Sequence, residues 1–441
     1  MNILIIGSGA REHAIARALK RSSQKPQLFC CGTSYNPGIE ELTKGYWVGD
    51  ITDSKQIIQA IQDWPIDFAF IGPEGPLEKG VADDLWAIDV PVIGPKKNLA
   101  QLESSKSFTR DLMQRHQIPG LPSFKAFSDM TGVAEFLNEL GEGNYVVKAN
   151  GLMAGKGVKV AGDHLHSFAD AIEFCQEILD QQQSFVIEEK LVGQEFSLMC
   201  FTDGLTLAPM PLVQDNKRAF ESDKGPNTGG MGSFSSADHG LPFLQERDAQ
   251  EALQISQQVL EAVCKETQDR YIGILYGGFI ATVRGVYVIE FNARFGDPEA
   301  LNVLSLIESD LVELCQDLIQ GCLKPDQIRF AAKATVCKYA VPHGYPDHPL
   351  RHGVINIDSV NNKEHLYLAA VNAEAGILYA TGSRAAAYVG VADTLSEAEL
   401  IAETEIVNIK GELFHRKDIG TAALIDQRIQ AMHRLRETPC A

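Results

Sequence analysis

A glycine-rich stretch, Gly151–Gly157, follows a short apolar run that ends in Lys148. Glycine lets backbone N–H groups approach phosphate oxygens closely, and Lys148 and Lys156 add positive charge. The stretch is not a Walker A loop, because three rather than four residues separate Gly151 and Gly155 and a glycine follows Lys156. It predicts a hairpin tip that closes over phosphates. A solvated hairpin with incidental lysines is the alternative.

Glu290 and Asn292 form a second candidate group. They alternate with apolar residues, so a strand would place both on one face. Two oxygen ligands on one face suit Mg²⁺, which takes its other ligands from water and phosphates. Arg294 continues this face and is the candidate for stabilising a transferring phosphoryl group. Asp297–Glu299 is predicted to open a helix with Pro298 in its first turn. A polar edge strand without a ligand is the alternative.

Carboxylates also accompany the predicted strand Phe185–Leu191. Glu188 lies among apolar residues at the end of this strand, where a carboxylate suits the amino group of a purine. Glu195, a few residues further on, is placed to hold ribose hydroxyls. The alternative is that these glutamates are simply solvated, which is the usual state of acidic residues at a strand end.

The N-terminal strand Asn2–Ile6 ends in a glycine turn, Gly7–Gly9, that leads into a helix. Free N–H groups at a helix N-terminus bind anions. A dinucleotide-binding fold is disfavoured, because Glu12 stands where its fingerprint has Gly or Ala and the second strand ends without an acidic residue. Arg11 suggests a terminal phosphate instead, and Glu74 adds a carboxylate at the same sheet edge. A plain tight turn is the alternative.

A polar segment rich in glycine occupies the middle of the chain, at Gln214–Arg218 and Gly225–Gly232. Segments of this kind commonly line a binding site. Asp215 and Lys217, which carry opposite charges, suit a zwitterionic or amine substrate. The alternative is a mobile surface loop.

The elements that must position these residues are predicted from hydrophobic patterns. Apolar strands alternate with helical segments up to Ile93, which predicts an open parallel α/β sheet. A helix is predicted at Ser105–His116, and a strand–loop–strand at Tyr145–Val160 belongs to a small α/β unit. An α+β stretch follows, and the region from Phe330 is rich in short strands. The chain is predicted to end with a helix at Ser396–Ile409 and a tail.

The amino-acid composition argues for a globular protein of several domains and against some kinds of partner. The 441 residues are 45% hydrophobic and suggest two to four domains. A net charge of -19 argues against a nucleic-acid or anionic-membrane partner. No apolar run approaches the roughly 20 residues of a membrane span. Scattered cysteines without a CxxC pair, and no secretory segment, predict a cytoplasmic location, and Cys30-Cys31 is predicted to be buried.

Seven motifs occur in order along nearly the whole chain: GSGAREHA (Gly7–Ala14), GPEGPLEKG (Gly72–Gly80), QLESSKSFTRD (Gln101–Asp111), VVKANGLMAGKGV (Val146–Val158), GPNTGGMG (Gly225–Gly232), IEFNARFGDPEAL (Ile289–Leu301) and HRKDIG (His415–Gly420). This set resembles the phosphoribosylamine–glycine ligase family of the ATP-grasp superfamily. The resemblance implies that ATP, glycine and 5-phosphoribosylamine give ADP, phosphate and glycinamide ribonucleotide in purine synthesis, with Mg²⁺ or Mn²⁺.

The resemblance also implies four parts and an assembly. These are an N-terminal α/β substrate-binding domain (1–103), an ATP-grasp large subdomain (104–122 and 192–327), a small mobile lid (123–191) and a strand-rich C-terminal domain (328–441). We expect a monomer or weak homodimer that acts on small molecules, without nucleic acid or membrane.

Site residues carry over position by position. The resemblance implies ATP contacts for Lys106, Lys148, Gly151, Gly155, Lys156, Gly157, Glu188, Leu191 and Glu195, and metal contacts for Glu290 and Asn292. Substrate-side roles are implied for Gly9, Arg11, Glu12, Glu74, Asp215, Lys217, Asn227, Gly230 and Arg294, with Arg294, Lys148 and Asp215 expected to be catalytic.

Departures from the family pattern concern the loop and the C-terminal surface and not the ligase assignment. Asn150 and Met153 stand where the family usually has Asp and Ala, and the C-terminal turn at His343-Gly344-Tyr345 lacks the usual double glycine. Ser383 replaces a glycine. The alternatives are another ATP-grasp carboxylate–amine ligase or carboxylase of purine metabolism, a nicotinamide-dependent dehydrogenase, and a catalytically silent nucleotide-binding protein.

Overall fold

The structure is a computed structural model that describes residues 1–153 and 157–437. Its N-terminal sheet is parallel, in the order β3-β2-β1-β4-β5. The strands are β1 (Asn2–Ile6), β2 (Gln27–Gly32), β3 (Thr43–Val48), β4 (Phe68–Ile71) and β5 (Val92–Ile93). The connecting helices are α1 (Ala10–Lys20), α2 (Pro37–Glu40), α3 (Ser54–Ile61), α4 (Glu74–Lys79) and α5 (Val81–Trp86). The strand order reverses between β1 and β4, so the turns that follow them meet where open α/β sheets bind ligands.

Two antiparallel sheets follow, after the short helices α6 (Gln101–Ser104) and α7 (Lys106–Arg115). The β7 sheet contains β6 (Phe124–Phe127), β9 (Phe185–Glu189), β7 (Tyr145–Ala149) and β8 (Val158–Val160), with helices α8 (Val133–Leu140) and α9 (Phe168–Asp180). The β16 sheet contains β11 (Leu207–Pro209), β10 (Gln194–Thr202), β16 (Gly273–Thr282) and β17 (Gly285–Asn292), and α10 (Glu246–Thr267) packs against it.

A third antiparallel sheet, the β18 sheet, joins the middle of the chain to its C-terminal region. It comprises β12 (Gln214–Asp215), β15 (Gly232–Ser235), β18 (Ala334–Pro342), β23 (Ala386–Ala392), β20 (Leu366–Leu368) and β24 (Leu413–Phe414). A separate hairpin holds β13 (Arg218–Phe220) and β14 (Lys224–Asn227), and a small sheet holds β19 (Val354–Ile355), β22 (Ile377–Ala380) and β21 (Val371–Glu374). The remaining helices are α11 (Glu299–Leu306), α12 (Leu311–Gln320), α13 (Leu395–Ile406) and α14 (Ala422–Glu437).

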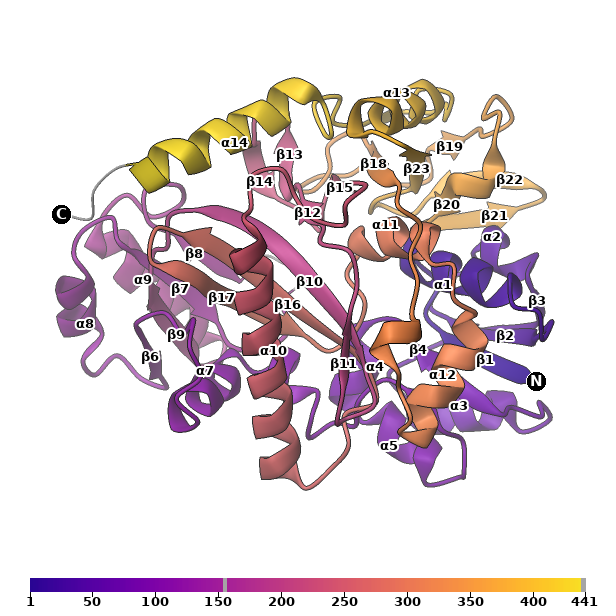
Figure 1. Cartoon of the computed structure of the whole chain (residues 1–441), viewed down its shortest axis with the longest axis horizontal. Helices are drawn as coiled ribbons and strands as arrows, with labels where there is room; N and C mark the ends of the chain where they lie inside the picture. Colours follow the sequence, from indigo (N-terminus) through magenta and orange to yellow (C-terminus); the bar gives the residue numbers. More distant parts are fainter. Residues whose placement is uncertain (154–156, 438–441) are drawn as a thin grey trace.

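The β7 sheet and the N-terminal sheet lie at opposite ends of the molecule, with the β16 sheet and α10 between them (Figure 1). One large apolar core runs through the N-terminal, β16 and β18 sheets. A second core fills the space between the β7 sheet and helices α8 and α9. The β7 sheet with its helices therefore packs as a unit of its own. This mixture of an open parallel sheet with antiparallel sheets confirms the predicted fold class.

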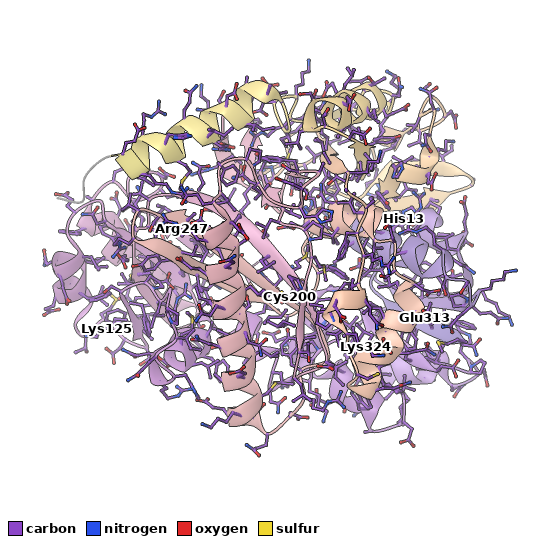
Figure 2. The ribbon with its side chains drawn as sticks, viewed as in Figure 1. His13, Lys125, Cys200, Arg247, Glu313 and Lys324 are labelled. Atoms are coloured by element: carbon purple, nitrogen blue, oxygen red, sulfur yellow. The ribbon has the colours of Figure 1, made fainter. Side chains whose placement is uncertain are left out.

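Buried cysteines contribute to these cores. Cys200 on β10 lies near the centre of the molecule, with Lys125 of the β7 sheet to one side (Figure 2). Cys30 and Cys31 on β2 are fully buried, as predicted. Burial raises the pKa of the Cys31 thiol to about 12. These thiols therefore act as small apolar side chains and are poor nucleophiles.

Three predictions about local structure are wrong. The predicted C-terminal tail contains α14, whose weak apolar periodicity hid a long helix that packs beside β16. Pro298 occupies the N-cap position of α11 and not its first turn. The polar segment predicted as loops forms the short strands β12, β13, β14 and β15. Strands β13 and β14 pair with each other in a local hairpin, while β12 pairs with β15, and β15 pairs with β18 of the C-terminal region.

Candidate active site

Two lysines meet where the β7 sheet faces the β16 sheet. Lys148 is buried on β7, and its ammonium lies 2.7 Å from a carboxylate oxygen of Glu188. It also donates to the carbonyl oxygen of Ile289 on β17, at 3.0 Å. Lys106, the first residue of α7, donates to the carbonyl oxygen of Gly151 at 2.9 Å. Burial lowers the pKa of both lysines, and nearby carboxylates partly oppose this effect.

Glu188 forms the centre of a buried charge network. Its two carboxylate oxygens accept from Arg110 at 2.7 and 3.1 Å, in addition to the Lys148 ion pair. Burial opposes ionisation, but the two cations outweigh it and lower the pKa of Glu188 to about 2. Arg110 also donates to the carbonyl oxygens of Val288 and Ile289. Glu188 therefore joins three elements and is buried, so the alternative of a solvated glutamate does not hold for it.

The glycine-rich loop connects β7 to β8. Gly151 adopts a φ of +91°, a conformation that disfavours side chains, while no atom of the described residues lies within 4 Å of the position its Cβ would take. Gly157, at the other end, accepts a hydrogen bond from Ala149 N–H at 2.8 Å. Gly155 and Lys156 lie outside the described residues. The described ends of the loop form an antiparallel hairpin, as predicted.

Asn150 fixes the start of the loop through uncharged hydrogen bonds. Its amide nitrogen donates to the hydroxyl groups of Ser107 and Ser184, at 3.0 and 3.1 Å. Its amide oxygen accepts from the Ser107 backbone N–H at 3.3 Å. An amide is suited to this position because it can donate and accept at once, which an ionised carboxylate cannot do.

Glu290 and Asn292 lie two residues apart on β17. The Glu290 side chain is 40% exposed and faces Gly278 across the sheet, which leaves it open space. Burial favours the neutral form, but Lys217, Lys148 and other nearby cations outweigh it and lower the pKa of Glu290. The Asn292 amide forms no hydrogen bond with the part of the chain that the structure describes. A carboxylate and a free amide oxygen on one strand face fit a divalent cation.

This metal site would draw its other ligands from outside the protein. Among residues 1–153 and 157–437, no three or more His, Cys, Asp and Glu side chains form a group suited to a metal ion. A Mg²⁺ ion commonly uses one or two protein ligands together with water and substrate phosphates. The two β17 residues therefore fit a metal that arrives with its nucleotide.

Leu191 and Glu195 flank the start of the β16 sheet. Leu191 is half-buried in the connection between β9 and β10. Glu195 is the second residue of β10, and its side chain is 56% exposed. The Lys217 ammonium lies 3.7 Å from its carboxylate. Lys217 also lies 3.9 Å from Glu290, so Glu195 shares a cation with one of the metal-ligand candidates.

The N-terminal glycine turn is filled by a carboxylate of its own chain. Glu12 is buried and accepts from the Gly9 N–H at 2.6 Å and from Arg11 Nε at 2.7 Å. A Cβ on Gly7 would lie 2.7 Å from Glu12 Cγ, and one on Gly72 would lie 2.5 Å from it. The negative charge of Glu12 therefore occupies the sheet edge where a dinucleotide pyrophosphate would bind, which opposes a dehydrogenase.

Arg294 links the end of β17 to the N-terminal sheet. Its guanidinium lies 3.1 Å from Glu74 and 2.7 Å from Glu103. The Arg294 charge lowers the pKa of Glu74 to about 2. Burial raises the pKa of Glu103 to about 7, although Arg294 opposes the shift. Arg294 also contributes to the low pKa of Glu290, so it lies within electrostatic reach of both candidate regions.

Asp215 is the last residue of β12, and Lys217 follows it by two positions. Oδ1 of Asp215 is buried and has no hydrogen-bond partner among the described residues. Burial and the neighbouring Glu299 raise the pKa of Asp215 well above its usual range. Burial opposes the charge on Lys217, but Glu195 and Glu290 outweigh it and raise the lysine pKa. The pair thus offers one unused acceptor beside a firmly charged ammonium.

Gly230 is required at its position for two reasons. Its φ is +105°, and a Cβ there would lie 2.6 Å from Asp215 Oδ1. Asn227, by contrast, lies on β14 opposite Arg218, and its side chain makes no hydrogen bond within the described ranges. The structure therefore brings Asp215, Lys217 and Gly230 together and leaves Asn227 on the adjoining hairpin.

Several site residues escaped the sequence analysis. Arg110 and Glu103 lie within a quoted motif, but their partners are distant in sequence and no local pattern reveals them. Arg384 donates to the carbonyl oxygens of Gly230 and Asp297, at 3.1 and 2.8 Å, and its guanidinium stacks 4.5 Å from the Tyr339 ring. Arg384 therefore holds the segment Gly225–Gly232 against the start of α11.

Known protein families and relatives match this chain along nearly its whole length. Models of the phosphoribosylglycinamide synthetase N domain, ATP-grasp (A) domain and C domain match residues 1–103, 104–300 and 335–422. The phosphoribosylamine–glycine ligase of Methanosarcina barkeri is 44% identical over 436 residues, which cover 99% of this chain and 100% of that protein. The chain belongs to the phosphoribosylglycinamide synthetase family.

Other relatives and solved structures support membership of this family. The phosphoribosylamine–glycine ligase of Methanocella arvoryzae is 45% identical over 437 residues, covering 99% of this chain and 100% of that one. The Thermotoga maritima phosphoribosylamine–glycine ligase structure superposes with a TM-score of 0.80 at 26% identity, covering 95% and 100%. A Campylobacter jejuni biotin carboxylase, at 14% identity, 98% and 95% coverage and a TM-score of 0.71, shares the fold alone.

In the parts of the chain with described coordinates, no helix combines the length and apolar character needed to cross a bilayer.

Proposed function

We propose that this protein ligates glycine to 5-phosphoribosylamine through a glycyl phosphate, using ATP, and so produces glycinamide ribonucleotide for purine synthesis. Relatives that bear the name phosphoribosylamine–glycine ligase match it over their full length. The structural observation that carries the proposal is the unpartnered, buried Oδ1 of Asp215 beside Lys217. A buried acceptor next to a cation suits the ammonium and carboxylate of a small amino acid.

The first chemical step forms the acyl phosphate. A glycine carboxylate oxygen attacks the γ-phosphorus of ATP, and the bond to the β,γ-bridging oxygen breaks as ADP leaves. Lys148, Lys106 and Lys217 supply the positive charge that offsets the charge developing on the phosphoryl oxygens. Asp215 regains its own charge when the glycine ammonium binds to it, because a neighbouring cation favours the ionised carboxylate.

The second step transfers the glycyl group. The amine nitrogen of 5-phosphoribosylamine attacks the acyl carbon, the bond from that carbon to the phosphate oxygen breaks, and the nitrogen loses a proton. Arg294, held by Glu74 and Glu103, is the group placed to stabilise the departing phosphate. The protein contributes positioning and exclusion of water, so no Ser or Cys nucleophile is needed.

Glu290 and Asn292 are proposed to hold Mg²⁺ or Mn²⁺, which when bound would neutralise phosphate charge. The four predicted parts, 1–103, 104–122 with 192–327, 123–191 and 328–441, are proposed as domains. The second core, which serves only the β7 sheet and its helices, supports a separate lid unit. A monomer or weak homodimer and a cytoplasmic location complete the proposal, and sedimentation equilibrium would test the assembly.

The deciding experiment is ADP release by the purified protein. We expect release to require both glycine and freshly prepared 5-phosphoribosylamine, and to stop when alanine replaces glycine. Bicarbonate in place of glycine tests the carboxylase alternative. ADP release with neither substrate, or with bicarbonate alone, would refute the proposed reaction.

A further inference from the structure

The hairpin β13–β14 lies beside the candidate site, and Arg218 stands at its start. Arg218 Nη2 lies 2.6 Å from Asp163 Oδ2. Its Nη1 donates to the Gly225 carbonyl oxygen across the hairpin, at 2.9 Å. Asp163 belongs to the turn after β8, in the unit built on the β7 sheet. Arg218 therefore joins two units that pack separately.

On its other side the hairpin is fixed to the C-terminal region. Arg416, which is 1% exposed, donates to the Arg218 carbonyl oxygen at 3.0 Å and to Asp223 in the hairpin turn at 3.0 Å. Asp418 accepts from Arg416 and from the Ser222 backbone N–H. The hairpin is thus a rigid support, and the sequence motif HRKDIG supplies its anchor.

Asp163 is held firmly on the opposite side. The turn that carries it is closed by hydrogen bonds from Gly162 N–H to Leu165 and from His164 N–H to Val160. Strand β8 pairs with β7 so that Val158 lies opposite Lys148. Asp163 and Lys148 are therefore joined through the paired strands of one unit.

Arg218 also adjoins a residue of the site. Lys217 precedes it, and the Lys217 carbonyl oxygen accepts from the Thr228 N–H and hydroxyl groups, both at 2.8 Å. The Lys217 ammonium lies 3.9 Å from Glu290 and 3.7 Å from Glu195. Arg218 is thus the chain neighbour of a residue whose ammonium lies near two carboxylates of the candidate site.

We propose that Arg218 is a positioning residue for phosphoryl transfer: its ion pair with Asp163 holds the β7 sheet against the hairpin and so aligns Lys148 and Lys217 about one nucleotide. This role rests on the proposed ligase function. Both partners are partly exposed, with side chains 24% and 47% accessible, so the contact can open and reform. An ion pair of this exposure shifts a conformational equilibrium by up to about fivefold.

The test uses the full-length protein with Asp163→Asn, Arg218→Gln and the double variant. Glu177→Gln is the matched control, because Glu177 pairs with Lys159 inside the β7 unit and does not face the hairpin. Hydrogen exchange of the ligand-free protein is measured first. We expect each single variant to speed exchange about two- to fivefold at residues 158–165 and 218–228, and the control to match the parent protein.

Steady-state kinetics then test the positioning role. We expect each single variant to lower kcat about two- to fivefold. The double variant should be no less active than the less active of the two single variants. The reversed pair, Asp163→Arg with Arg218→Asp, should recover activity. Unchanged exchange, or effects that multiply in the double variant, would overturn the proposal. Absence of glycine-dependent ADP release in the parent protein would instead refute the proposed function, while the exchange result would still decide whether the contact holds the two units together.

Discussion

Two glycine-rich turns follow strands in this chain, and their glycines serve different purposes. At the N-terminal turn, Gly7 and Gly72 make room for the carboxylate of Glu12, which packs where their Cβ atoms would be. At the loop after β7, Gly151 has no neighbour among the described residues within 4 Å of a Cβ and is needed for its positive φ. One turn is closed by internal packing, and the other is not filled by any side chain in the described part of the protein.

The charges around the two turns differ in the same way. Glu12 neutralises Arg11 and takes up the Gly9 N–H, so the N-terminal turn satisfies its own polar groups. Near the β7 loop, the charge of Lys148 is paired with Glu188, but Lys106 adds a positive charge whose hydrogen bond goes to a backbone carbonyl oxygen, that of Gly151. A glycine pattern therefore indicates a phosphate site only when the neighbouring side chains leave both space and charge for it.

The largest effect is expected at the internal charge network of the β7 region. Glu188→Ala leaves Arg110 and Lys148 buried without their counter-charge, which should lower the free energy of unfolding by about 3–5 kcal/mol. Urea denaturation measures this. Glu12→Ala should cost less, because it leaves one cation, Arg11, without its counter-charge, whereas Glu188→Ala leaves two. Equal losses in the two variants would contradict the comparison.

A substitution on the open side of the site should lower the catalytic activity without lowering the stability of the fold. Glu290→Ala removes a partly exposed carboxylate whose proposed role is to hold the metal. We expect kcat to fall about 10²–10³-fold, the range for removing one charge-stabilising group, with little change in unfolding free energy. Glu177→Gln is the control with normal activity. Normal turnover of Glu290→Ala at limiting Mg²⁺ would exclude this metal site.

The two carboxylates on Arg294 should give opposite pH dependences. Folding raises the pKa of Glu103 from 4.5 to about 7, so the folded state binds the extra proton, and stability should fall as pH rises from about 4.5 to 7. Folding lowers the pKa of Glu74 to about 2, so its contribution is present above pH 4.5 and is lost as pH falls toward 2.

Glu103→Gln tests this pair. It should flatten the dependence of the unfolding free energy on pH between pH 4.5 and 7. The size of this effect is roughly 1–3 kcal/mol, at about 1.4 kcal/mol per pKa unit. The loss of unfolding free energy below pH 4.5, which is due to Glu74, should stay unchanged. Urea denaturation over pH 3–8 measures both slopes. A slope in the upper range that persists in Glu103→Gln would show that another group titrates there.

The sequence predicted the strands and turns whose signals are local. The hydrophobic runs of β1, β4, β7 and β17 and the glycine turns between elements are readable because neighbouring residues determine them. The pairing of β15 with the C-terminal strand β18 was not predicted, because no local pattern specifies a partner about a hundred residues away.

The candidate site shows the same limit. Glu290 and Asn292 were recognisable from alternation alone, since both lie on one strand. Glu188 has its role set by Arg110, which lies 78 positions away, and Arg384 reaches the segment at Gly230 from a distance of 154 positions. Contacts of this kind depend on how the sheets pack, so only the assembled structure reveals that a motif residue such as Glu188 is a buried partner.

The smallest effects come from the glycines themselves, and they separate crowding from backbone strain. Gly72→Ala would place a Cβ 2.5 Å from Glu12 Cγ, in a buried and hydrogen-bonded setting, and should cost about 1–3 kcal/mol of stability. Gly151→Ala meets no neighbouring atom but must hold a φ of +91°, which should cost about 1–2 kcal/mol. Thermal and urea unfolding measure both losses.

A second substitution at each turn identifies the cause. Shortening the crowding side chain, in Gly72→Ala with Glu12→Asp, should recover part of the loss, and the two changes should therefore be non-additive. Gly151→Asn should be milder than Gly151→Ala, because Asn tolerates positive φ better than other side chains. If Glu12→Asp gave no relief to Gly72→Ala, Glu12 would not be what requires glycine there, and the two turns would no longer differ in the way the structure indicates.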